Sequence, residues 1–181
     1  LEMPRRGDGV RLWYSDDTRI EEVQMVDSRD LVIWFAKRTV VARCIVRGGR
    51  YGLHYMYCED NDFNDNVSSD NQVGGTIMYS RRIRLKGNRF ERCRGPSAYG
   101  LQLKDADDVD AVGNEFVDNT RGVYFDNSPQ AEDAVCVFRG NLFALNDAGV
   151  SILPDTRRAR FEGNAFIDNL TSVEVLGHSD P

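Results

Sequence analysis

The sequence has few histidines and cysteines, and none of its apolar runs is long enough to cross a membrane. Its 181 residues include 2 His, 4 Cys and 5 Pro. The cysteines have neither the C-x-x-C pairing of zinc sites nor the density of a disulfide framework in a chain of this size. No stretch approaches the ~20 consecutive apolar residues of a membrane helix. The sequence therefore argues against a zinc finger, a disulfide-stapled miniprotein and a helical membrane protein.

The charge balance is acidic and typical of a globular domain. Lys and Arg number 23 against 29 Asp and Glu, a formal net charge of −6, and 41% of the residues are hydrophobic. This balance argues against non-specific nucleic-acid binding and against disorder. A local basic run is interpreted as a solvated face, with an anionic partner surface as the alternative. The run consists of Arg81, Arg82, Arg84, Lys86, Arg89, Arg92 and Arg94.

A repeated motif, G-N-x-F, indicates the fold. Its four copies begin at Gly87, Gly113, Gly140 and Gly163, and each is preceded by a short strand-like alternation. Short strands with frequent turns and no helical periodicity predict an all-β parallel β-helix (a solenoid) of about seven coils. A leucine-rich repeat is excluded because its L-x-x-L-x-L pattern is missing. We expect residues 1–181 to form a single domain, and to be a segment of a longer protein.

In such a solenoid, equivalent residues of successive coils become neighbours. The motif then predicts an internal stack of Phe90, Phe116, Phe143 and Phe166, with Val46 and Ser68 in the same row. It also predicts an asparagine ladder of Asn66, Asn88, Asn114, Asn141 and Asn164. Small buried positions are expected for Cys44, Cys93 and Cys136.

The outward side chains of the first strand in each coil carry the predicted site. Successive coils place Trp13, Trp34, Met56, Met78, Lys104, Asp126 and Leu153 at one outward position. Met56 and Met78 should therefore lie ~4.8 Å apart in backbone position, with His54 on the same surface. Two thioethers and an imidazole suit soft Cu(I), and Cys58 is a marginal further ligand. The alternative is plain apolar surface beneath another segment or partner.

Trp13 and Trp34 continue the same row. Two stacked indoles suit a partner surface, a lid over a nearby metal, or a platform for sugar rings. The sequence leaves these three roles open.

The stretches RYGLHYMYCEDNDFNDN, MYSRRIRLKGNRF and YGLQLKD resemble the NosD family of periplasmic maturation factors for nitrous oxide reductase, over about Gly7 to Leu170. The resemblance implies a right-handed β-helix in the periplasm. It implies work with an ABC transporter, made of an ATPase and a membrane subunit, and with a copper chaperone, in assembling the copper–sulfur centre of nitrous oxide reductase. His54, Met56 and Met78 then become candidates for receiving or presenting copper, with sulfur as the alternative cargo.

Polysaccharide lyases and epimerases are the competing function for this fold. They need carboxylates and a basic residue for proton abstraction beside a sugar carboxylate. Charged residues available for this are Lys104, Asp105, Asp107, Asp108 and Asp126, although we expect Asp107 and Asp108 to lie in a turn. The second histidine, His178, falls in a polar tail that we expect to be disordered. We therefore predict a non-catalytic copper-handling protein, with a polysaccharide-active β-helix and a ligand-free scaffold as alternatives.

Overall fold

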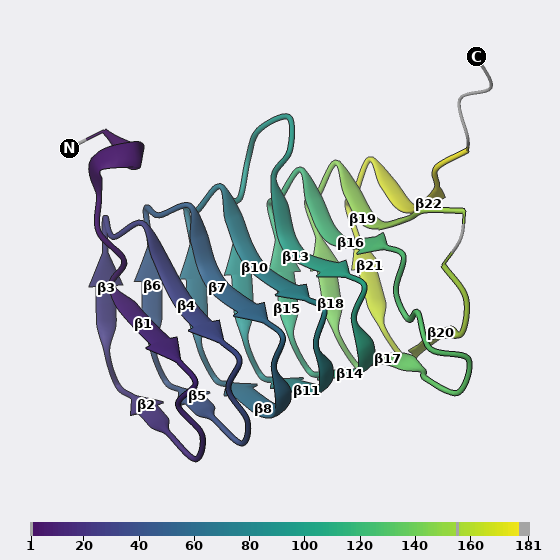
Figure 1. The fold of residues 1–181 in the computed structure, drawn as a ribbon. Helices are drawn as coiled ribbons and strands as arrows, with labels where there is room; N and C mark the ends of the chain where they lie inside the picture. Colours follow the sequence, from purple (N-terminus) through teal and green to yellow (C-terminus); the bar gives the residue numbers. More distant parts are fainter. Residues whose placement is uncertain (1, 155, 178–181) are drawn as a thin grey trace.

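A computed structural model describes residues 2–154 and 156–177 and shows three parallel sheets wound around one core (Figure 1). His178 lies outside the described residues. Only a short 3-10 helix, η1 (Met3–Arg5), precedes the strands. No helix within residues 2–154 and 156–177 has the length and apolar character needed to span a bilayer. The prediction of an all-β parallel β-helix is confirmed, with eight strands in the longest sheet where about seven coils were expected.

Each coil contributes one strand to each sheet in turn. Sheet A contains β1 (Val10–Trp13), β4 (Asp30–Trp34), β7 (Tyr51–Met56), β10 (Val73–Met78), β13 (Tyr99–Lys104), β16 (Arg121–Asp126), β19 (Ala148–Ile152) and β22 (Thr171–Val175). Sheet B contains β2 (Arg19–Glu21), β5 (Val40–Ala42), β8 (Glu59–Asn64), β11 (Arg81–Lys86), β14 (Asp107–Val112), β17 (Cys136–Arg139) and β20 (Ala159–Glu162). Sheet C contains β3 (Gln24–Val26), β6 (Ile45–Arg47), β9 (Val67–Ser69), β12 (Arg89–Glu91), β15 (Glu115–Val117), β18 (Leu142–Ala144) and β21 (Ala165–Ile167).

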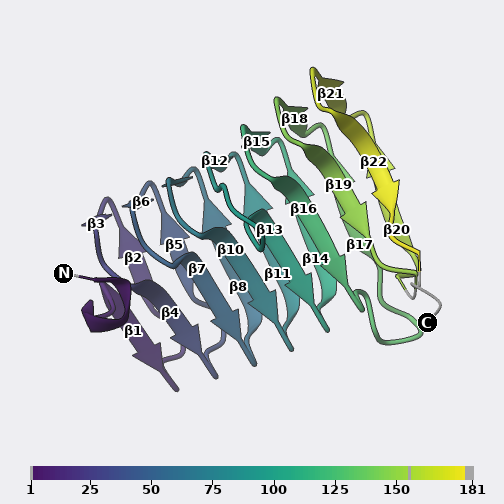
Figure 2. The ribbon, with the colours of Figure 1, turned by 90° about the horizontal axis from the view of Figure 1, so that it is seen from above.

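The two ribbon views show the direction of the coil. From the N-terminus, the chain runs down sheet A at the front, crosses through sheet B at the bottom and returns upward along sheet C behind (Figures 1 and 2). This path is right-handed, as expected for parallel strands joined by crossovers.

The repeated phenylalanines form the predicted internal stack. The ring centroids of Phe90, Phe116 and Phe143 follow one another at 5.3 and 5.0 Å, with interplanar angles of 5° and 12°. Phe166 extends the stack at 4.8 Å, and Ser68 pairs in register with Phe90 at its other end. These rings line the inner face of sheet C, which no single coil could bury alone.

The asparagines form the predicted ladder. Asn88 Nδ2 donates to Asn114 Oδ1 at 2.9 Å, and Asn114 Nδ2 donates to Asn141 Oδ1 at 3.1 Å. Cys44 occupies the same row, and its backbone N–H donates to Asn66 Oδ1 at 2.8 Å. All four cysteines are free and buried, and burial raises the pKa of Cys93 and Cys136 to about 12. The prediction that Cys44, Cys93 and Cys136 are structural core residues fits these contacts.

The arginines of the basic run pair with carboxylates, most of them on neighbouring coils. Arg82 Nε donates to Asp60 Oδ1 at 2.7 Å. In the same way, Arg92 Nε donates to Asp70 Oδ1 at 2.8 Å. The remaining arginines of the run pair likewise: Arg81 with Glu59, Arg84 with Asp62, Arg89 with Glu91 and Glu115, and Arg94 with Asp118 and Asp147. These pairs favour the solvated-face interpretation over an anion-binding surface.

Candidate functional site

The outer face of sheet A carries the row predicted from the sequence. Strand pairing aligns Trp34 with Met56, and Met56 with Met78, so the two methionines occupy neighbouring coils as predicted. Both methionine side chains are half-buried. His54 lies two residues before Met56 on the same strand and therefore on the same face. The backbone thus brings the three predicted ligands together, while their binding of a metal stays a prediction.

His54 is far more buried than an outward position suggests, with 7% of its surface exposed. The Trp34 ring lies 5.3 Å from the imidazole in an edge contact, and the Tyr51 ring lies 4.9 Å away. Neither imidazole nitrogen has a hydrogen-bond partner among the described residues. Burial lowers the pKa of His54 from 6.5 to about 4. The ring is therefore neutral at physiological pH, and a neutral imidazole is the form that binds metals.

Cys58 takes no part in this surface. Its thiol is 2% exposed and lies in the hydrophobic core, where Sγ donates to the carbonyl of Ile33 at 3.0 Å. Burial raises the pKa of Cys58, which keeps the thiol protonated and unsuited to bind metal. The expectation that Cys58 could be a marginal ligand is therefore wrong, because the side chain turns inward at the corner after β7.

The predicted pair of tryptophans is adjacent, but the rings meet edge to face. Trp13 and Trp34 have centroids 5.6 Å apart at an interplanar angle of 68°, where parallel stacking was expected. Trp13 is 51% exposed, whereas Trp34 is half-buried between Trp13 and His54. Trp13 therefore presents an open ring to solvent, while Trp34 packs against the His54 ring.

The residues that follow this row form an aromatic ladder, which the sequence reasoning missed. The ladder consists of Tyr14, Phe35, Tyr57 and Tyr79. Successive ring centroids lie 4.9, 4.9 and 5.1 Å apart with interplanar angles of 12° to 14°. The signal was present as the repeated pairs Trp-Tyr, Trp-Phe, Met-Tyr and Met-Tyr at one repeat position. Because stacked rings cover one another's faces, the ladder presents mainly ring edges to solvent.

The charged residues that the competing enzyme function would need form hydrogen bonds and ion pairs within the fold. Lys104 Nζ lies 3.0 Å from Asp126 Oδ2, and this bond raises the pKa of Lys104, so the amine is a poor general base. Asp105 accepts a hydrogen bond from Asn127 Nδ2 at 2.5 Å. Asp107 and Asp108 begin strand β14 rather than lying in a turn, which corrects our expectation. Asp107 Oδ1 accepts the backbone N–H groups of Gln130 and Ala131 in the loop between β16 and β17 of the next coil.

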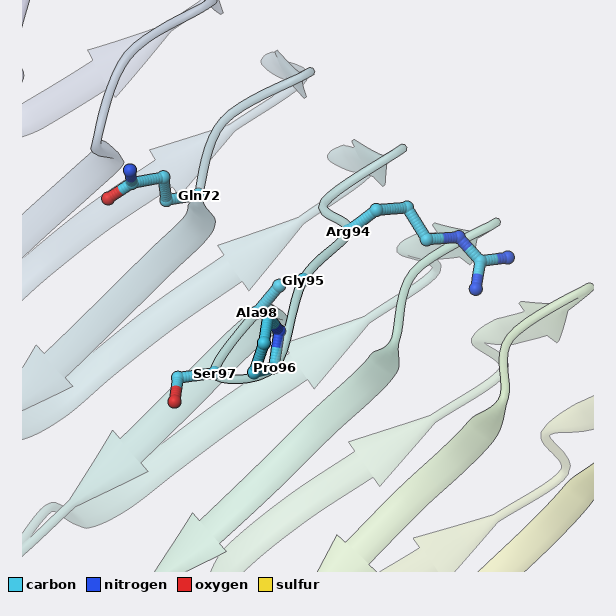
Figure 3. Close-up of a pocket in the computed structure, with 6 residues that line it drawn as sticks. All are labelled: Gln72, Arg94, Gly95, Pro96, Ser97 and Ala98. Carbon is cyan, nitrogen blue, oxygen red and sulfur yellow. The ribbon is translucent and has the colours of Figure 1, made fainter.

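A hollow beside the loop between β12 and β13 offers no reactive group (Figure 3). Its lining consists of Gln72, Arg94, Gly95, Pro96, Ser97 and Ala98. Only Arg94 is charged, and its side chain turns away from the hollow toward later coils, where it pairs with Asp118 and Asp147 (Figure 3). In the part of the chain that the structure describes, no three His, Cys, Asp or Glu side chains gather as metal ligands.

Comparisons with known proteins give one family and a shared fold. No curated protein matches the chain. The solved periplasmic alginate epimerase AlgG is similar in fold, with a TM-score of 0.69 at 16% identity, covering 91% of this chain and 41% of that one. The mannuronan C-5 epimerase AlgE4 A-module of Azotobacter vinelandii has a TM-score of 0.49 at 12% identity, covering 90% of this chain and 55% of that one. The chain thus spans about half the length of these structures, and the likeness to AlgG shows the fold alone.

A family model covers essentially the whole chain. It matches residues 2–180 and is described as periplasmic copper-binding protein (NosD). The match includes all three stretches on which the resemblance was based, and the outward row with His54, Met56 and Met78. This chain therefore belongs to the NosD family.

Proposed function

We propose that this chain is a non-catalytic periplasmic protein that carries Cu(I) as cargo, with His54, Met56 and Met78 as ligands. The proposal depends on one observation. A buried, neutral imidazole, with both nitrogens unpartnered within the described residues, shares an outer face with two methionines of adjacent coils. A buried polar group without partners requires an explanation, and a ligand that completes it is one. The copper named in the family description agrees with this donor set.

The three donors suit transport rather than permanent binding of the metal. Thioethers are soft neutral ligands that favour Cu(I), and imidazole is an accepted partner. A site of neutral donors adds no negative charge to the monovalent ion, so a thiolate on an acceptor protein can displace them. With the imidazole already deprotonated, Cu(I) does not have to displace a proton from His54 above about pH 5.

The wider setting of the proposal follows from the family resemblance. In this setting a copper chaperone delivers the ion, and an ABC transporter with ATPase and membrane subunits works beside the chain. The copper–sulfur centre of nitrous oxide reductase is then assembled with this copper. Trp13, Trp34 and the aromatic ladder form the surface on which such a partner docks. This surface flanks Met56 and Met78, so a docked partner would lie directly beside the metal.

Anaerobic Cu(I) titration against a chromophoric competitor tests the proposed site. Replacing His54 with alanine, or Met56 or Met78 with leucine, is expected to weaken binding by about tenfold or more in each case, because each change removes one of few donors. Met25→Leu is the matched control, since Met25 is buried in β3 and away from the outer face of sheet A. If the parent, the three ligand variants and Met25→Leu all bind Cu(I) with equal affinity, the proposed site is wrong. Alginate turnover by the parent, lost in Asp126→Asn, would contradict the non-catalytic assignment.

A further inference from the structure

An ion pair on the outer face of sheet A holds the Tyr51 ring beside His54. Arg50 donates two hydrogen bonds to the buried carboxylate of Asp30, one of them from Nε to Oδ1 at 3.1 Å. The same Oδ1 accepts the backbone N–H of Tyr51 at 3.1 Å. The Arg50 guanidinium lies 4.8 Å from the centroid of the Tyr51 ring, within the range of a cation–π contact. Asp30 therefore fixes both the backbone and the ring of Tyr51 through one carboxylate.

One residue more in β7 than in β4, a feature that β10, β13 and β16 share, explains why Tyr51 can reach His54 at all. Residues three apart in a regular strand point to opposite faces. The pairing of β4 with β7 aligns Asp30 with Tyr51 and Val32 with His54, so β7 holds one extra residue between them. The extra residue brings Tyr51 and His54 to the same face. Gly52 makes this possible, since a Cβ there would lie 2.0 Å from Ser68 Oγ.

The two rings around His54 differ in how firmly they are held. Trp34 lies in the middle of its row, in contact with Trp13 on one side and aligned with Met56 on the other. Tyr51 stands at the start of its strand and is half-exposed. Moving Trp34 would break up the row of proposed ligands and partner residues, whereas the ring contacts of Tyr51 within the described residues are those with Arg50 and His54. Tyr51 is therefore the ring whose movement uncovers the imidazole.

We propose that Tyr51 is a gate over His54 and that the Asp30–Arg50 pair is the latch that keeps it closed. The gate serves the copper site and in that respect rests on the proposed function, but access to the imidazole is measurable without copper. In the closed state, both nitrogens are shielded from reagents and competing metals. Opening requires the Tyr51 ring to leave the Arg50 guanidinium and swing away from the outer face of sheet A. A partner that contacts Arg50 would thus control when His54 becomes available.

Diethyl pyrocarbonate measures this access directly. A neutral imidazole nitrogen attacks one carbonyl carbon of the reagent and forms an N–C bond, while ethyl carbonate leaves and breaks down to ethanol and carbon dioxide; the product loses the ring proton to solvent. Peptide mass spectrometry follows the modification at His54, with N-acetylhistidine in the same tube as a reference for reagent decay. Tyr51→Ala is expected to accelerate labelling about tenfold, and Arg50→Gln to accelerate it by a smaller factor.

Two control variants separate gating from general loosening. Tyr51→Phe keeps the ring over His54 and is expected to label at the parent rate. Tyr99→Ala removes a tyrosine at the equivalent position two coils later, which stacks on Tyr124 instead, and is also expected to label at the parent rate. Labelling of Tyr51→Ala at the parent rate would overturn the gate, and so would equal acceleration by Tyr99→Ala.

The copper measurement distinguishes the gate from the function it serves. If labelling accelerates in Tyr51→Ala while His54→Ala binds Cu(I) as tightly as the parent, the gate stands and the copper site falls. If labelling is unchanged while Cu(I) binding depends on His54, the copper site stands and the gate falls. Both together are expected, with Cu(I) binding to Tyr51→Ala faster than to the parent.

Discussion

Replacing Asn114 with alanine is expected to lower the free energy of unfolding by about 4 kcal/mol, the sum of several buried hydrogen bonds lost at once. Asn114 Oδ1 accepts the backbone N–H and the side-chain amide of Asn88, both at 2.9 Å. Its Nδ2 donates to the carbonyl of Leu85 at 3.0 Å and to Asn141 Oδ1. Asn114 is 1% exposed, so water cannot replace these partners, and alanine leaves their polar groups buried and unsatisfied.

Asn164→Ala is the matched comparison for this effect. Asn164 occupies the same ladder in the last coil, accepts from Asn141 and donates to the carbonyl of Phe138 at 2.9 Å, but is only half-buried. Solvent can reach the groups that it leaves behind, so we expect a loss of about 1 kcal/mol. Urea unfolding followed by far-UV circular dichroism compares the two variants. Equal decreases in the free energy of unfolding for Asn114→Ala and Asn164→Ala would show that the burial of the asparagine does not determine the size of the effect.

Acidification should destabilise the parent by roughly 3 kcal/mol through His54 alone, the free energy of a pKa that falls from 6.5 to about 4. Burial is the main cause of the lowered pKa; the positive charge of Arg50 lowers it further, while Asp30 and Asp8 oppose the shift. Between pH 6.5 and about 4, the unfolded chain binds a proton at His54 and the folded chain does not. Stability therefore rises with pH across this window, and the contribution levels off above and below it.

His54→Leu isolates this contribution from that of the carboxylates. Several carboxylates also titrate in acid, such as Glu59, whose pKa is lowered to about 2 by its bonds with Lys37, Arg81 and Arg82. Both proteins share those groups, so the difference between their unfolding free energies reports on His54. We expect this difference to change steadily from pH 6.5 to 4 and to be flat at higher pH. Parallel stability curves for the two proteins would show that the imidazole is not held neutral by burial.

The features that the sequence predicted correctly are those that repeat with the coil. Asn88 and Asn114, Phe90 and Phe116, and Met56 and Met78 become neighbours because the solenoid turns one sequence period into one backbone step. Their side chains need only the common register to meet. The asparagine ladder, the phenylalanine stack and the alignment of the methionines could therefore be predicted from the sequence alone.

The features that the sequence missed depend on which side chains pack together, not on the register that the coils share. His54 is buried because the Tyr51 and Trp34 rings pack against it, whereas the step at Gly52 that brings Tyr51 to its face recurs in β10, β13 and β16. Neither ring contact follows from alternation of inward and outward residues. Cys58 was misplaced because it follows the strand end and turns inward at the corner, as Ser80 does one coil later. The kind of side chain at each repeated position, rather than the repeat itself, therefore decides that the imidazole is enclosed.

The aromatic ladder stands at a corner where the backbone adopts an unfavourable conformation. Tyr14, Phe35, Tyr57 and Tyr79 adopt left-handed φ values between 49° and 55°, a conformation that costs a bulky residue about 1 kcal/mol. The next two coils fill the same place with Asp105 and Asn127, residue types that adopt it readily. Asparagine or glycine at these four sites would adopt the same conformation at a lower cost in stability. The left-handed conformation of these four aromatic residues is thus a cost to the fold, in agreement with the partner surface proposed for them.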